Sequence, residues 1–214
     1  MFFPKFLDLT EQHTLLHAAL HKLDSLENRA LRRRRKDFLS TRSPIPETAQ
    51  TVEDFFPDQY YDFHEGHFDG VIKHFRETHV SSWGNADSPA LSAVIDRLRT
   101  LYPSDSETQM HVLHLASDGE ILPHVDNVGA SGSWILGVSL GATRVLRLED
   151  TDDAAPRAPF NLPLPSGSVY IQRDSIRYGY KHSILRAEDP SRGQRLSVMV
   201  RDILPKGANI PLAM

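Results

Sequence analysis

A short stretch, Leu122-Pro-His-Val-Asp-Asn127, holds metal-binding residue types at a spacing that suits a strand. In an extended segment alternate side chains point to the same face, so His124 and Asp126 would lie side by side. An imidazole and a carboxylate joined by one more histidine form the ligand set of non-haem Fe(II) oxygenases, which leaves coordination positions open. His-x-Asp alone is a common pattern in a chain with 11 histidines, so it needs partners elsewhere.

A third ligand should come from a facing strand. His182 is the only histidine after Asp126, and its segment, Tyr178–Leu185, has the composition of a strand. A single histidine on a strand is more often a surface or core residue. The combination with His124 and Asp126 is what favours a metal site that includes His182.

The segment Arg195–Arg201 alternates polar and aliphatic residues, so Arg195 and Arg201 fall on one face. They are separated by about 20 Å of strand. On an exposed face both arginines would simply be solvated. Inside a barrel an unpaired guanidinium is costly to bury and needs an anion. Because a guanidinium matches a carboxylate through two parallel hydrogen bonds, a dicarboxylate cosubstrate whose other end reaches the metal would satisfy this face.

Strands after residue 108 must position these residues. The expected strands are Met110–Leu115, Trp134–Leu140, Thr143–Leu148, Phe160–Leu164, Ser168–Gln172, Tyr178–Leu185 and Gln194–Ile203. Turn residues separate them, for example at Ser117–Gly119 and Pro165–Gly167. Many short strands at this spacing predict a sandwich or barrel, here a double-stranded β-helix, or jelly roll.

The first half of the chain predicts helices and loops. One helix should run from Glu11 toward Leu26 after Thr10, and another should begin at Pro89 after Ser88 and end before Pro103. Residues 41–58 predict a loop. We therefore expect an α+β, mainly β, single domain over residues 1–214. Residues 1–107 would form helical and loop support on one face of a jelly-roll core, residues 108–204.

The amino-acid composition limits the classes of function that the chain can have. Hydrophobic residues make up 40% and charged residues 24%, and the net charge is −4, so no global basic field favours nucleic acid. The absence of cysteine excludes disulfides, thiolate metal sites and cysteine nucleophiles. No apolar run approaches a membrane span. We expect a monomer without a membrane or DNA partner. The first ten residues lack signal- or transit-peptide features, which by itself favours the cytosol.

Two other stretches each have two interpretations. The run Arg32–Lys36 could bind RNA or form a solvated charged face at a helix end, and we favour the charged face because the run is short and the chain acidic. The aromatic residues within 55–68 could stack on bases or cover a core. We favour the core, which is where aromatic side chains are usually found.

These motifs together resemble those of the AlkB-like Fe(II)/2-oxoglutarate-dependent dioxygenases. The likeness is greatest to the mitochondrial branch of the seventh human AlkB homologue, which is associated with programmed necrosis. It extends from about residue 31 to residue 203 and includes Leu31–Arg35, His74–Thr78, His111–Leu115, Pro123–Asp126, Gly167–Tyr170 and Arg195–Val198.

The resemblance implies Fe(II), 2-oxoglutarate and O2 as cofactor and cosubstrates. The metal ligands, which are also the catalytic centre, would be His124, Asp126 and His182. Arg195 and the Tyr170 hydroxyl would bind the far carboxylate of 2-oxoglutarate. Arg201 would lie near the metal end and steady Asp126. The resemblance also implies a location in the mitochondrial matrix, with the cytosol as the alternative.

The reaction implied is hydroxylation or demethylation of a macromolecule. Residues 80–109 contain a helix and few basic residues, so we expect the base-gripping lid of nucleic-acid AlkB enzymes to be missing, which favours a protein substrate over RNA. Three alternatives stay open: an RNA (tRNA) N-demethylase, a non-catalytic jelly-roll binding protein, and a zinc hydrolase of similar shape.

Overall fold

The computed structural model describes residues 1–42, 46, 48–103, 105, 107–127, 132–152, 157–187 and 193–203. The helices are α1 (Leu9–Asp24), α2 (Arg29–Thr41), α3 (Pro89–Arg99) and α4 (Asp174–Gly179), with 3-10 turns η1 (Thr51–Asp54), η2 (Asp58–Tyr60) and η3 (Gly84–Ala86). The strands are β1 (Phe2–Phe3), β2 (His64–Gly66), β3 (Ile72–Val80), β4 (Thr108–His124), β5 (Trp134–Gly141), β6 (Arg144–Asp150), β7 (Phe160–Leu164), β8 (Ser168–Arg173), β9 (Tyr180–Ile184) and β10 (Arg195–Asp202).

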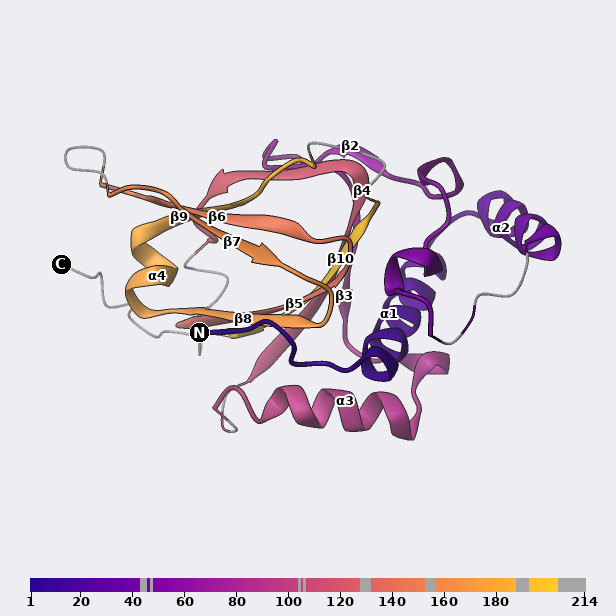
Figure 1. Ribbon diagram of the computed structural model, residues 1–214, viewed down its shortest axis with the longest axis horizontal. Helices are drawn as coiled ribbons and strands as arrows, with labels where there is room; N and C mark the ends of the chain where they lie inside the picture. Colours follow the sequence, from indigo (N-terminus) through magenta and orange to yellow (C-terminus); the bar gives the residue numbers. More distant parts are fainter. Residues whose placement is uncertain are drawn as a thin grey trace.

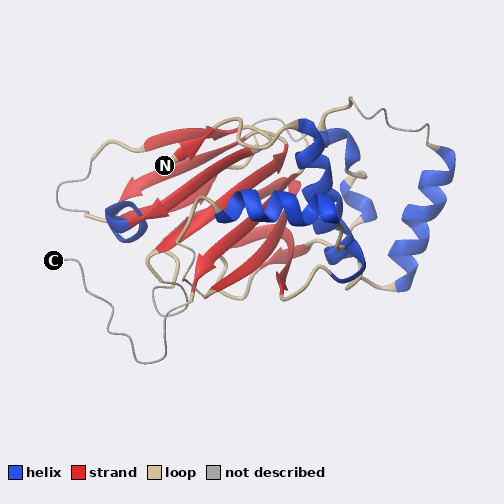
Figure 2. Ribbon diagram, turned by 90° about the horizontal axis from the view of Figure 1, so that it is seen from below, coloured by secondary structure: helices blue, strands red, loops and turns tan. Residues whose placement is uncertain are grey.

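The strands form one curled antiparallel sheet in the order β1-β8-β5-β10-β4-β9-β6-β7, and the hairpin β2-β3 joins it through β4. The sheet bends back over itself, with α1 and α2 toward one end, α3 along one outer face and α4 near the opposite end (Figures 1 and 2). The prediction of a mainly β jelly roll with helices on one face is confirmed. No helix in the described part of the chain is long and apolar enough to cross a membrane.

Strand β4 links the two halves of the curled sheet. It pairs with β10 as far as Leu115 and with β9 from Ile121 to His124. The turn predicted at Ser117–Gly119 is therefore wrong, because the chain continues through it as a strand. Turn-forming residues serve here as the bend between the two halves. A Cβ on Gly119 would lie 2.6 Å from the carbonyl oxygen of His74, so only glycine fits this close approach.

The two faces of the sheet pack differently. On the outer face a large apolar core joins β10, β5 and β8 to α1 and α3, and its members include Leu15, Leu16, Leu91, Val94, Leu196, Val198 and Val200. On the inner face a smaller core includes Leu113, Leu115, Leu146, Leu148 and Tyr170. The aliphatic face predicted for Arg195–Arg201 is the outer one, which places its arginines on the inner face.

The helix ends follow local capping. The helix α3 begins as predicted, with Ser88 accepting from the Leu91 amide at 3.2 Å. The helix α1 begins earlier than predicted, because Asp8 rather than Thr10 is the N-cap. Asp8 accepts from the Glu11 amide at 2.9 Å, and its own amide donates to the Glu11 carboxylate at 2.9 Å. This reciprocal pair is a capping box.

The first 107 residues also contribute strands, which differs from the prediction of helical and loop support alone. The strand β3 pairs with β4 from Ile72 to Val80. Its sequence gives no clean apolar alternation, because charged residues occupy both faces: Arg76 points outward and is buried, and Glu77 points inward and is half-buried. Arg76 pairs with Asp24 and Glu27, and Glu77 pairs with His111.

The basic run lies in the middle of α2, not at a helix end as predicted. Its side chains are exposed except for that of Arg35, which is buried. Arg35 binds the carboxylates of Asp24, at 3.4 Å, and Glu27. Arg76 binds the same two carboxylates at 2.6 and 2.8 Å. One member of the run is thus part of a buried ion-pair network that joins α2 to α1 and β3.

The aromatic residues of 55–68 mainly cover the core, as predicted. Phe55 and Tyr61 are buried, and their rings lie 4.9 and 5.1 Å from that of the buried His114. Phe63 packs on the same ring at 5.0 Å. Phe68 differs, because it is 94% exposed at the tip of the β2-β3 hairpin.

Candidate metal and cosubstrate site

The three residues predicted as metal ligands lie together on the inner face. His124, at the end of β4, pairs in register with His182 of β9, and their ring centroids are 4.3 Å apart. The nearest Asp126 oxygen is 3.1 Å from His124 Nε2 and 3.8 Å from His182 Nε2. All three ligand atoms lie within 4.8 Å of one another. Such an arrangement can hold one metal ion with positions to spare.

A backbone carbonyl sets the orientation of His124. Its Nδ1 lies 2.9 Å from the Leu122 carbonyl oxygen, which can only accept, so Nδ1 carries the hydrogen. In a neutral ring Nε2 then has a free lone pair facing the Asp126 carboxylate. Two acceptors face each other there, and either a proton or a metal ion must lie between them. A carbonyl behind the ring is the usual arrangement for a metal-bound histidine.

The electrostatics give His182 and Asp126 the protonation states that a metal needs, whereas His124 would release its proton when the metal binds. Burial lowers the pKa of His182 to about 4, although the Asp126 carboxylate acts in the opposite direction. Burial also tends to lower the pKa of His124, but hydrogen bonds to Asp126 and the Leu122 carbonyl outweigh burial and raise it. Burial tends to raise the pKa of Asp126, but the two histidines hold it well below its ordinary range. An ionised carboxylate beside a neutral imidazole is ready to bind a cation.

The arginine that contacts Asp126 is one that the sequence did not single out. Arg177 of α4 is buried and donates from Nη1 to the Asp126 carbonyl oxygen at 3.2 Å. The resemblance assigns Arg201 the role of steadying Asp126, but Arg201 faces Gln109. With the Gln109 amide oxygen turned toward Arg201, it accepts from Arg201 Nε at 3.1 Å and from Nη2 at 3.2 Å. The role of Arg201 at Asp126 stays a prediction. Arg177 was missed because α4 is too short to have a sequence pattern.

The predicted cosubstrate arginine is buried on the inner face. Arg195 is 1% exposed, and its Nε donates to the Ser139 hydroxyl at 3.0 Å. Among the described residues Arg195 Nη2 has no hydrogen-bond partner and no carboxylate lies within ion-pair distance of Arg195. A buried guanidinium nitrogen without a partner is costly, so this position is suited to an anionic ligand.

Tyr170 lies beside Arg195 because a glycine makes room for its ring. Tyr170 of β8 pairs in register with Gly137 of β5, and a Cβ at Gly137 would overlap the ring. Burial raises the pKa of Tyr170, with the charge of Arg195 acting in the opposite direction. The hydroxyl therefore keeps its proton at neutral pH and can donate it to an anion bound by Arg195.

A second inner arginine comes from the opposite half of the sheet. Arg144 of β6 is 3% exposed, and its Nη2 donates to the carbonyl oxygens of Ser117 and Ala116 at 2.6 and 3.1 Å. Its Nε and Nη1 have no hydrogen-bond partner among the described residues. Burial and the charge of Arg195 lower the pKa of Arg144 to about 10. The alternation Arg144, Leu146, Leu148 could have revealed this residue.

Similarity to known proteins shows which family the chain belongs to. The sequence matches the profile described as the 2OG-Fe(II) oxygenase superfamily over residues 1–201. The chain belongs to this superfamily. The chain is 40% identical over 149 residues to the mouse protein named alpha-ketoglutarate-dependent dioxygenase alkB homolog 7, mitochondrial, and 39% identical over 151 residues to the bovine protein of that name. Each match covers 66% of this chain and spans 65% of the length of the relative.

The fold of the chain is shared more widely. It matches a Pseudomonas putida prolyl-4-hydroxylase with a TM-score of 0.52 at 12% identity, covering 95% of this chain and 92% of that chain. The superfamily uses Fe(II), 2-oxoglutarate and O2. The inner face fits these groups in two observations: two imidazoles and a carboxylate lie together, and a buried arginine nitrogen beside a tyrosine lacks a partner.

Proposed function

We propose that this chain is an Fe(II)- and 2-oxoglutarate-dependent dioxygenase. Fe(II) would be held by His124, Asp126 and His182, and the far carboxylate of 2-oxoglutarate by Arg195 and Tyr170. The observation that carries the proposal is the unpaired Arg195 Nη2, which is buried on the same inner face as the metal residues. A cosubstrate with two carboxylates would explain both that nitrogen and the metal residues on the same face.

The residues of the chain would bind, orient and exclude water. Bound Fe(II) and 2-oxoglutarate supply the activation of O2 that oxidises a C–H bond. Asp126 neutralises part of the metal charge, and Arg177 holds the backbone of Asp126 in place. The Tyr170 hydroxyl donates to the cosubstrate carboxylate. Apolar residues of the inner core keep water from the buried end of the site.

We infer that the substrate is a protein side chain rather than RNA. The segment between Val80 and Gln109 forms η3 and α3, and α3 packs on the outer face, away from the metal residues. The basic α2 lies at one end of the long axis, and α4, whose Arg177 touches Asp126, lies near the other (Figure 1). The run Arg32–Lys36 is therefore poorly placed to hold the phosphates of a nucleic acid at the metal.

The remaining expectations rest on resemblance. The mouse and bovine relatives are named as mitochondrial, and we propose a mitochondrial location for this chain. The monomeric state, the lack of membrane and DNA partners, and the link to programmed necrosis stay predictions.

Succinate release tests the enzyme proposal. The chain incubated with Fe(II), 2-oxoglutarate and O2 should release succinate, and His182→Ala should abolish release because one of three metal ligands is lost. The control is His21→Ala, an exposed histidine on α1, which should release succinate like the unaltered chain. If no succinate forms under any condition, or if both variants behave alike, the proposal is wrong.

Product analysis tests the substrate. Protein substrates should gain one oxygen atom by mass spectrometry, with succinate formed in step. N-methylated RNA oligonucleotides should release no formaldehyde above background. Formaldehyde released from RNA, with loss of the methyl group, would overturn the protein assignment while leaving the dioxygenase proposal intact.

A further inference from the structure

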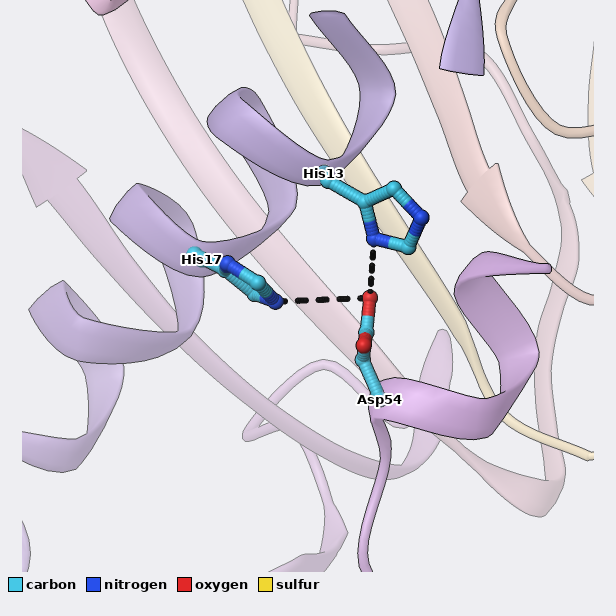
Figure 3. A group of neighbouring side chains, drawn as sticks. All are labelled: His13, His17 and Asp54. Atoms are coloured by element: carbon cyan, nitrogen blue, oxygen red, sulfur yellow. Dashed lines mark hydrogen bonds and ion pairs between the residues drawn. The ribbon is translucent and has the colours of Figure 1, made fainter. Parts of the chain in front are cut away.

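A second group of metal-binding side chains lies where α1 meets η1. His13 and His17 are one turn apart on α1 and point the same way, and Asp54 of η1 faces both (Figure 3). One Asp54 oxygen, Oδ2, lies 2.6 Å from His13 Nδ1 and 3.4 Å from His17 Nε2. All three ligand atoms lie within 4.8 Å of one another.

The hydrogen bond made by His13 Nε2 shows that Nδ1 is the ring nitrogen available to bind a metal. His13 Nε2 lies 3.0 Å from the Ala49 carbonyl oxygen, which can only accept, so Nε2 carries a hydrogen. In a neutral ring Nδ1 then has no hydrogen and directs its lone pair at the Asp54 carboxylate. Something positive must lie between these two acceptors, either a second proton on the ring or a metal ion. The carbonyl behind the ring again matches the support of a metal-bound histidine.

We propose that His13, His17 and Asp54 form a second divalent-metal site, suited to Zn²⁺, with solvent as the fourth ligand. Two imidazoles and one carboxylate are a ligand set that zinc accepts in tetrahedral geometry. The site would tie α1 to the segment that carries η1.

The distances are close to what zinc requires. Ligand bonds of about 2.0–2.1 Å in a tetrahedron separate neighbouring ligand atoms by about 3.3 Å. The separation of His17 and Asp54, 3.4 Å, already has this value. His13 and Asp54 must move apart by about 0.7 Å, judged from the same bond lengths. The His17 side chain is 62% exposed and so has room to adjust.

Burial makes Asp54 a strong ligand. Its side chain is 7% exposed. Burial tends to raise the pKa of Asp54, but hydrogen bonds from His17 and His13 lower it below its ordinary value. The carboxylate is therefore ionised at neutral pH, in a place where its charge needs a partner.

The site is separate from the proposed iron site and has a structural role. The helix α1 packs on the outer face of the sheet, whereas His124 and His182 belong to the inner face. Thr51, at the start of η1, bonds the Ser166 hydroxyl at 2.7 Å, in the turn before β8. An ion at Asp54 would fix this segment between α1 and the sheet.

Zinc titration in an Asp126→Ala background tests the proposal, because this background weakens the iron site. Purified metal-free protein is titrated with Zn²⁺ alone against a chromophoric chelator. We expect a single equivalent to bind with low-micromolar or tighter affinity and to raise Tm. His17→Ala in the same background should weaken binding by about tenfold or more, since a direct ligand is lost. Because the His17 side chain is exposed, its replacement should leave the fold intact, which circular dichroism checks.

His21→Ala in the same background is the matched control, since His21 is an exposed histidine one turn further along α1. It should bind Zn²⁺ like the Asp126→Ala parent. Equal zinc binding by the His17→Ala and His21→Ala variants, or no zinc binding by the parent, would overturn the site. Neither outcome depends on succinate release, so the test stands apart from the dioxygenase proposal.

Discussion

Replacing Arg195 by methionine separates a cosubstrate role from a structural one. Methionine has a similar length but no charge, and Arg195 is almost fully buried with one nitrogen unpaired. A guanidinium–carboxylate contact in a dry interior is worth about 3 kcal/mol, so affinity for 2-oxoglutarate should fall about 100-fold. The cosubstrate-free protein loses one bond to Ser139, about 1 kcal/mol, but also loses a desolvated charge, so its Tm should change little.

Two measurements separate the expected loss of affinity from the expected small change in stability. Calorimetric titration of 2-oxoglutarate into Fe(II)-loaded protein without O2 measures the affinity, and thermal unfolding of the cosubstrate-free protein measures stability. Arg147→Met is the control, because Arg147 lies on the other face of β6 and pairs with Glu149 at 3.1 Å. Unchanged affinity in Arg195→Met would refute the cosubstrate assignment. A large fall in Tm that accompanies the fall in affinity would show that Arg195 serves the fold.

Three further predictions concern the two groups of metal-binding residues and the tyrosine pocket. Asp126→Ala should lose Fe(II), measured by metal analysis after desalting, because one of three ligands is removed. Gly137→Ala should lower the affinity for 2-oxoglutarate, since its Cβ would overlap the Tyr170 ring. It should also lower the free energy of unfolding, measured by chemical denaturation, by about 1–3 kcal/mol. Gly179→Ala, with open space around the new Cβ, should change neither quantity. The hydrogen bond to Asp54 outweighs burial and raises the pKa of His17, so its stabilising effect is complete below the unfolded pKa and is lost as pH rises through the folded pKa. In metal-free protein His17→Ala should therefore lower Tm more at about pH 5.5 than at about pH 8.5.

The strands and the metal group could be predicted because each depends on a local pattern. A short apolar run marks β5, and period-two alternation marks β6 and β10, each within a residue or two of its ends. His124 and Asp126 share a face through their spacing alone. His182 follows once the chain is taken as a jelly roll, since a later strand must return beside β4, and the register indeed sets it opposite His124.

What the sequence could not predict depends on partners far along the chain. The strand β3 has no apolar alternation, and its buried Arg76 is matched by Asp24 of α1. The turn residues 117–119 form a bend because β4 continues along β3, which no local rule can reveal. Asp54 meets His13 only after the segment from 48 to 54 has folded back on α1, so histidines at helical spacing alone gave no sign of a site.

The chain uses two ways to bury an arginine, and the difference between them identifies the ligand. Arg35 and Arg76 are buried against two carboxylates, Asp24 and Glu27, so their charges are balanced within the fold. Arg195 and Arg144 are buried as deeply, yet no described carboxylate lies within ion-pair distance of either. In the sequence Arg35 stands in a run of basic residues and Arg195 in an alternating strand, and neither pattern shows which arginine has a carboxylate partner within the fold. Because an unbalanced pair of buried cations is costly, we expect the inner face to gain stability when an anion binds between its two halves, and a dicarboxylate that also reaches the metal would satisfy both needs.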